Sequence, residues 1–136
     1  MAPSLDTLLP HRAPMQWIEA LTDCTDTTAT ATARFTADHF AVANGTVPET
    51  ALIECMAQTV AAALGERSRR GGHGIRAGHG MLGAVSNFHI YTAPPLDKPI
   101  LIEVREIKRF GPMLLIAGVI SCEGHRIADG DLSLYA

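Results

Sequence analysis

One long apolar helix is the feature that most constrains the fold of this chain. Residues 48–68 are rich in strong helix formers, have no proline after Pro48, and are followed by the helix-breaking pair Gly71-Gly72. About 20 residues, at ~1.5 Å each, form a rod roughly 30 Å long. Apolar side chains cover most of the circumference of this helix, so we expect the rest of the chain to surround and bury it.

Five segments with the pattern of β-strands flank this helix. Before it, residues 24–35 alternate threonine and alanine with the two-residue period of a half-exposed strand. After it come four β-branched or apolar segments punctuated by glycine or proline, at residues 80–92, 99–110, 112–123 and 125–136. Their short connections predict an antiparallel meander. We expect an α+β fold in a single domain, residues 1–136, with one long central helix wrapped by a curved antiparallel sheet of five or six strands.

The composition of the chain excludes several classes of protein. With 136 residues, of which 47% are hydrophobic and 18% charged, the chain resembles one folded domain rather than a disordered segment. Its net charge of −3 argues against a nucleic-acid or anionic-lipid partner. No stretch stays apolar for the roughly 18 residues of a membrane span, and the N-terminus lacks the pattern of a signal peptide. We therefore expect a cytoplasmic protein.

Neither a metal site nor a bound cofactor is expected. The three cysteines are far apart and form no Cys-x-x-Cys pair, which indicates reduced and packed thiols. His73 and His79 have no third ligand nearby at the spacing of a metal site. The glycines of residues 71–83 follow a helix rather than lead into one, which disfavours a phosphate-binding loop.

Three short motifs contain residues that can support chemistry. They are Leu9-Pro10-His11-Arg12-Ala13-Pro14, His39-Phe40 and Leu52-Ile53-Glu54-Cys55-Met56-Ala57-Gln58. Together they resemble the hotdog-fold β-hydroxyacyl-acyl-carrier-protein dehydratases, which have a Leu-Pro-His-Arg-x-Pro start, a His-Phe-Pro loop and a Glu-x-Met-Ala-Gln helix. The match extends to the loop at 93–100 and to the closing segment at 127–132. Within the first motif, His11 and Arg12 are expected to fix the N-terminal segment rather than to react.

The loop before the helix departs from that family pattern. Ala41 stands where the pattern has the proline after His-Phe, and Glu49 stands where it has a glycine. The interval of 15 residues from His39 to Glu54 is one residue longer than in the pattern. The segment 45–48 reads Gly-Thr-Val-Pro. It is similar to the Gly-x-Val-Pro helix start of the divergent dehydratase-like proteins of aryl-polyene synthesis, and we expect the chain to be closest to these.

The reaction that this resemblance implies is loss of water from a β-hydroxyacyl thioester, which needs a base for the α-proton and an acid for the departing hydroxyl. A histidine is largely neutral near pH 7, so His39 is the expected base. Glu54 is the expected acid, because burial in an apolar helix disfavours a charged carboxylate. Gln58 lies one helical turn after Glu54, where it can hydrogen-bond the carboxyl group or simply satisfy the core. The resemblance implies that His39 and Glu54 meet across a dimer interface at the end of an acyl tunnel.

The substrate itself is expected at the start of the helix. Backbone N–H groups near Pro48, Glu49 and Thr50 can polarise the thioester carbonyl, because a helix N-terminus carries unpaired donors and positive potential. Glu49 can alternatively complement the helix dipole without touching substrate. Met56 and Phe88 are candidates for lining the acyl tunnel, although core packing explains them equally well.

A cluster of arginines ends the helix and follows it, at Arg67, Arg69, Arg70 and Arg76. Cations at a helix C-terminus complement the helix dipole, which is one explanation. The other is a docking surface for an acidic acyl-carrier protein with its phosphopantetheine-linked acyl chain, as the resemblance implies. Both explanations remain open at this point.

The function expected from these motifs is that of a 3-hydroxyacyl-acyl-carrier-protein dehydratase, a hydro-lyase, acting as a homodimer or as a heterodimer with another hotdog protein. One alternative is an acyl thioesterase of the same fold, which uses a helix carboxylate to activate water. The other alternative is a non-catalytic hotdog subunit that stabilises an active partner, because the loop after His39 has lost its proline and its glycine.

Overall fold

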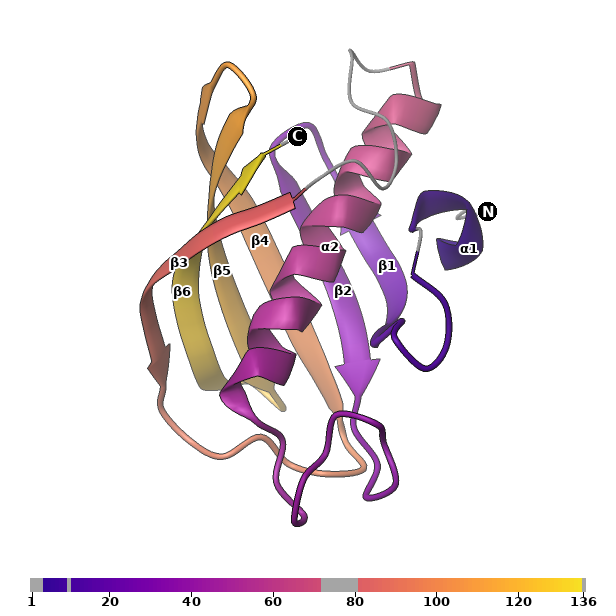
Figure 1. Ribbon diagram of the computed structural model, residues 1–136, viewed down its shortest axis with the longest axis vertical. Helices are drawn as coiled ribbons and strands as arrows, with labels where there is room; N and C mark the ends of the chain where they lie inside the picture. The colour runs from indigo at the N-terminus through magenta and orange to yellow at the C-terminus, as the bar shows by residue number, and fades with distance from the viewer. Residues whose placement is uncertain (1–3, 10, 72–80, 136) are drawn as a thin grey trace.

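The computed structural model describes residues 4–9, 11–71 and 81–135 of the chain. Figure 1 shows one long helix lying in the concave face of a curved sheet. The elements are α1 (Leu5–Leu8), β1 (Ile18–Cys24), β2 (Thr28–Arg34), α2 (Glu49–Arg69), β3 (Met81–Ile90), β4 (Pro99–Phe110), β5 (Met113–Cys122) and β6 (His125–Tyr135). Among the described residues, no helix is long and apolar enough to cross a bilayer.

The sheet has six strands in the order β1-β2-β4-β5-β6-β3, and all neighbouring strands are antiparallel. The predicted helix is confirmed as α2, and the predicted segment 24–35 contains β2. Strand β1, at residues 18–24, has no regular alternation between buried and exposed side chains, which is why periodicity alone did not locate it. The α+β architecture with one central helix and a curved antiparallel sheet is therefore confirmed.

The predicted meander of four strands is wrong for the first of them. Strand β3 pairs with β6, for example through Val85 and Leu132, and not with β4, which follows it in the chain. Both edges of β4 are already occupied, by β2 and by β5. Residues 91–98 therefore carry the chain across the end of the sheet (Figure 1). As a result β3 is an edge strand of the sheet.

Small residues let α2 approach the sheet closely. On β2, Ala29, Ala31 and Ala33 are the inward-facing positions and are at most 1% exposed. On β5, a Cβ at Gly118 would lie 2.7 Å from the sulfur of Met56, which is completely buried. Glycine at this position leaves the space that the Met56 side chain fills. The long helix is held on its sheet side by contacts of this kind.

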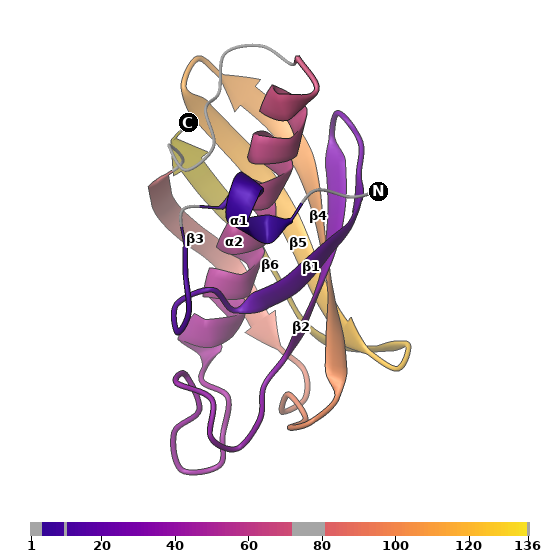
Figure 2. The same cartoon turned by 90° about the vertical axis from the view of Figure 1, so that its right-hand side faces the viewer.

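One face of α2 is not covered, which corrects the expectation of a helix buried on all sides. Ile53, Glu54, Ala57 and Ala61 share one face of the helix and are only half-buried, while most other residues of the helix are buried. Figure 2 shows why: α1 and β1 lie against one side of α2, and the sheet covers another side. The remaining side has no covering element among the described residues.

The inner face of β3 lies open as well. Leu82, Val85 and Ile90 pair in register with buried residues of β6, so their side chains point toward the helix side of the sheet. They are nevertheless between 37% and 41% exposed. The open strip of α2 and the apolar side of this edge strand form a surface that we call the open face.

Candidate active site

Gln58 connects the open face of α2 to strand β1. Its side chain is 1% exposed, and its Oε1 accepts the N–H groups of Trp17 and Ile18 at 2.8 and 3.3 Å. Its Nε2 donates to the carbonyl oxygen of Met15 at 2.7 Å and to Oε2 of Glu54 at 2.9 Å. Because the backbone groups set which end of the amide accepts and which donates, the orientation of Gln58 is determined. Gln58 thus supports Glu54 and satisfies the core at the same time.

Glu54 has one held and one open carboxyl oxygen. Oε2 receives the bond from Gln58 and lies 3.5 Å from Nε2 of His11. Within the part of the chain that the structure describes, Oε1 has no partner, and it is not among the fully buried unpaired atoms. The Glu54 side chain is 33% exposed in the single chain, so it is less enclosed than an apolar helix suggests. An anchored carboxyl group with an accessible oxygen can exchange a proton with a bound substrate.

His11 is the site residue that sequence reasoning missed. It was expected only to fix the N-terminal segment, and Arg12 does so by donating to the carbonyl oxygens of Leu9 and His11 at 2.7 and 2.8 Å. The structure also brings the His11 ring to Glu54, and its Nδ1 is buried without a hydrogen-bond partner. The signal in the sequence is the Leu-Pro-His-Arg motif itself, but only the packing of this segment on α2 shows which helix residue it reaches.

His39 lies in the loop between β2 and α2, with its ring held on three sides. The ring makes edge contacts with Phe35 and Trp17, at centroid distances of 4.6 and 5.8 Å. Its Nδ1 accepts the backbone N–H of Ala41 at 2.9 Å. Burial lowers the pKa of His39 below its ordinary value, and this outweighs the raising effect of the Asp38 carboxylate. The ring is therefore neutral at pH 7.

His39 and Glu54 are not in direct contact within one chain. Among the described residues neither a hydrogen bond nor an ion pair joins them. They are linked through Trp17, whose ring contacts His39 and whose N–H binds Gln58. The structure thus brings Glu54 and Gln58 together but leaves the meeting of His39 with Glu54 across an interface as a prediction.

An NMR titration of His39 tests the electrostatics of this loop. We expect its ring signals to titrate with a midpoint below the ordinary value of 6.5, because the folded chain disfavours the charged ring. At a pH between the His39 pKa of the folded chain and the higher pKa of the unfolded chain, the unfolded chain binds more protons than the folded chain. The free energy of unfolding therefore falls as the pH is lowered through this window. His39→Gln assigns the signals and should remove this component of the pH dependence. A midpoint at or above 6.5 would contradict a half-buried ring whose charged form is disfavoured.

The helix start and the candidate tunnel residues occupy different surroundings. Pro48 is the N-cap of α2 and provides no side-chain cap, while Glu49 and Thr50 are exposed in the first turn. The first N–H groups of a helix have no partner within the helix, so a role for them in polarising a carbonyl stays a prediction. Met56 is completely buried beneath Gly118, whereas Phe88 is half-buried against Gly130 on the inner side of β3. Of these two, only Phe88 borders the open face.

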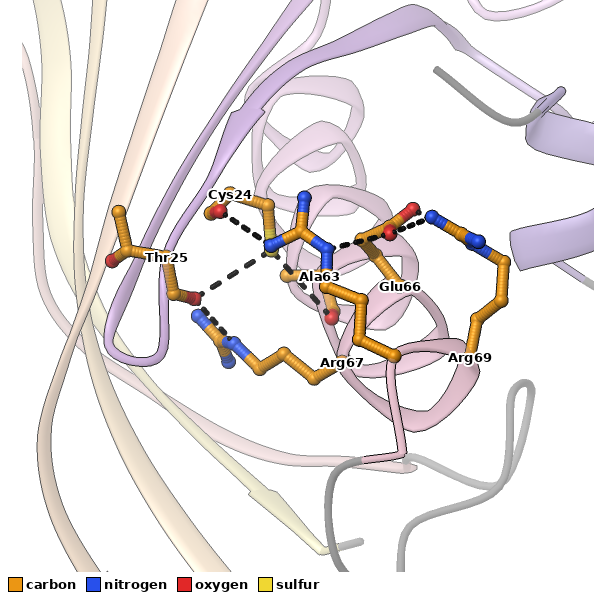
Figure 3. A network of polar contacts seen from close by, with 7 residues as sticks. Cys24, Thr25, Ala63, Glu66, Arg67 and Arg69 are labelled. Carbon is orange, nitrogen blue, oxygen red and sulfur yellow. Dashed lines mark hydrogen bonds and ion pairs between the residues drawn. The ribbon is translucent and has the colours of Figure 1, made fainter. Parts of the chain in front are cut away.

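The arginines at the end of α2 form an intramolecular network (Figure 3). Arg67 donates to the carbonyl oxygens of Thr25, in the turn after β1, and of Thr28, the first residue of β2, at 2.7 and 3.3 Å. Arg69 and Arg70 both pair with Glu66, whose side chain is 3% exposed. The hydrogen bond from Arg69 is the main cause of the lowered pKa of Glu66.

This network attaches the end of the helix to the sheet, and it leaves part of the positive charge accessible. The side chains of Arg69 and Arg70 remain 47% and 55% exposed. Arg76, the fourth predicted member of the docking surface, lies outside the described residues. Docking of a carrier protein thus stays a prediction for these side chains.

Comparison with solved structures confirms the hotdog fold. The dehydratase heterocomplex ApeI:P from Xenorhabdus doucetiae matches with a TM-score of 0.86 and 24% identity, over 99% of this chain and 91% of that chain. A hypothetical thioesterase protein with coenzyme A from Streptococcus pneumoniae matches with a TM-score of 0.67 and 12% identity, over 85% and 83% of the two chains. An uncharacterized protein from Pyrococcus horikoshii has a TM-score of 0.71 and 11% identity, over 99% and 94%.

Comparison of sequences then identifies the family. The search of curated proteins finds no match. The family model named ApeP-like and described as ApeP dehydratase matches residues 3–136, which is nearly the whole chain. The chain therefore belongs to the ApeP-like dehydratase family, which confirms the resemblance stated on its motifs.

Proposed function

We propose that this chain eliminates water from a β-hydroxyacyl thioester, as a dehydratase of aryl-polyene synthesis. The observation that carries the proposal is the carboxyl group of Glu54, anchored through one oxygen by Gln58 and accessible at the other. The neutral ring of His39 supplies a second polar group, and its Nε2 has no partner among the described residues. The family assignment supports this reaction over thioester hydrolysis. Unpaired thiols at all three cysteines suit the reducing cytoplasm.

A second hotdog chain is proposed as the structural partner. The open face combines an edge strand, half-buried helix positions and exposed apolar side chains, which together are typical of an unfilled interface. The ApeI:P protein of Xenorhabdus doucetiae is described as a heterocomplex, which supports a heterodimer here. A homodimer would cover the same surface. Either partner would bring a second loop or a second helix toward Glu54.

An acyl-carrier protein is the proposed donor of the substrate, and its docking can be separated from the chemistry. Arg69→Ala removes a half-exposed charge, and Arg70 still pairs with the buried Glu66, so the fold should tolerate it. We expect KM for a carrier-linked substrate to rise about 2- to 5-fold at low salt, because one exposed ion pair is worth ~0.2–1 kcal/mol. KM for a short pantetheine thioester should not change. Arg34→Ala, at the opposite end of the sheet, is the matched control, and equal effects of both variants would contradict docking at Arg69.

The assay that tests the proposed function follows the hydration of crotonyl thioesters and the dehydration of 3-hydroxybutyryl thioesters. The chain is purified alone and after co-expression with ApeI of Xenorhabdus doucetiae, and released thiol is measured in parallel. Dehydration without thiol release is the expected result. Thiol release alone would replace the proposal by a thioesterase. A stable complex whose activity does not depend on Glu54 would show a non-catalytic subunit.

A further inference from the structure

The loop after His39 determines which nitrogen of its ring carries the proton. A backbone N–H can only donate, so the bond of 2.9 Å from Ala41 requires Nδ1 to be an acceptor. The neutral ring must then carry its single proton on Nε2. A proline at position 41, as in the family pattern that the loop departs from, has no N–H and could not make this bond.

We infer that Glu54 performs both proton transfers of the elimination, while His39, set in its Nε2–H form by Ala41, acts as a hydrogen-bond donor to the thioester carbonyl. This inference rests on the proposed function and names the roles within that site. It differs from the roles expected from residue types alone, in which His39 takes the α-proton. In this division of roles, Ala41 has a chemical effect that a proline could not have, because its N–H sets the Nε2–H form of His39.

Two properties of the His39 ring argue against proton transfer by it. Nε2 already holds a proton and cannot accept another, while Nδ1 is occupied by Ala41 and faces the protein backbone. Full donation of the Nε2 proton would leave an imidazolate anion, which a neutral histidine does not form near pH 7. The ring can, however, polarise an oxygen that develops negative charge, as preorganised donors do.

Glu54 has the features that both transfers require. Gln58 donates to Oε2 and is itself held by Met15 and Trp17, so the carboxyl group is oriented. Oε1 has no partner within the described part of the chain, and the Glu54 side chain is 33% exposed, so this oxygen is available to a bound substrate. His11 approaches the held oxygen, Oε2, with its Nε2 at 3.5 Å.

The resulting sequence of steps balances without another reactant. The Glu54 carboxylate removes the α-proton, so a C–H bond breaks, an O–H bond forms, and negative charge moves to the thioester oxygen that His39 Nε2–H contacts. The electron pair then forms the α,β double bond as the bond to the β-hydroxyl breaks. The proton on Glu54 passes to the departing oxygen as water, and the carboxylate is restored.

Substitutions at His39 distinguish this division of roles from a histidine base. The amide nitrogen of glutamine lies as far along the side chain as Nε2 and can donate, but it cannot accept a proton. We therefore expect His39→Gln to keep kcat within about 10-fold of the parent, and His39→Ala to lose about 100-fold, the effect of removing one such donor. Equal, large losses in both variants would overturn the inference while the proposed dehydration stands.

Ring ¹⁵N shifts of His39 in the 136-residue chain give a readout independent of activity. We expect the pyridine-like shift on Nδ1 in the parent and in Ala41→Gly, which keeps the backbone N–H. Ala41→Pro should lose this preference. A protonated Nδ1 in the parent would overturn the inference even if Ala41→Pro fails to fold. Absence of dehydration by the parent, alone and with its hotdog partner, would overturn the proposed function and the roles with it.

Discussion

Glu54→Gln should lower kcat for dehydration by about 1,000-fold and leave the fold intact, since acid–base residues typically contribute ~10²–10⁴-fold. The substitution is nearly isosteric, and the carbonyl oxygen of the new amide can still accept the bond from Gln58. What is lost is the ability to take up and return a proton. The measurement is the initial rate of enoyl thioester formation, with urea unfolding to confirm that stability is unchanged.

The matched control for this variant is Glu103→Gln on the outer face of β4, where the side chain is exposed. It changes the same charge but lies on the opposite side of the sheet from α2. We expect its rate to equal that of the parent. If both variants fall equally, net charge rather than the Glu54 carboxyl group governs the rate. If neither falls, Glu54 has no part in the reaction.

Gln58→Leu should lower the free energy of unfolding by about 3 kcal/mol, because each buried polar group left without a partner costs ~1–3 kcal/mol. The amide satisfies the N–H groups of Trp17 and Ile18 and the carbonyl of Met15, and leucine can satisfy none of them. Activity should fall as well, since Glu54 loses the donor that orients it. Chemical denaturation of the purified chain measures the first effect, and the dehydration assay measures the second.

Thr59→Val is the matched control for the loss of stability expected in Gln58→Leu. Thr59 is also completely buried on α2, but its hydroxyl donates to the carbonyl of Cys55 within the same helix. We expect a cost of about 1 kcal/mol, the net value of an ordinary hydrogen bond. A cost for Gln58→Leu no larger than that of Thr59→Val would mean that the amide does not hold β1 against the helix.

The secondary structure was largely predictable because it depends on local patterns. The composition of α2 and the alternation in β2 specify their conformations without reference to the rest of the chain. The pairing of β3 could not be predicted in this way, because it depends on whether the edges of β4 are free. The alternation of buried and exposed side chains along a strand does not specify which distant strand it pairs with.

In the candidate site, too, contacts within one helix were predictable and contacts between distant segments were not. The spacing of four residues between Glu54 and Gln58 predicted their contact, because a helix places such residues on one face. Other contacts join segments that are far apart in the chain. The backbone groups that Gln58 binds before and at the start of β1 are 40 to 43 residues away in sequence, and His11 is similarly distant from Glu54. No local rule predicts such distances.

The sequence by itself determined the family and the long helix, and it pointed to Glu54, Gln58 and His39 as candidate groups, because these follow from residue type, spacing and order. Only the tertiary structure decided that, among the described residues, one face of α2 stays open, Ala41 donates to His39 and one oxygen of Glu54 has no partner. The physical reason is that hydrogen bonds and burial arise between elements. Which groups are satisfied, and which remain available for chemistry, is set by packing.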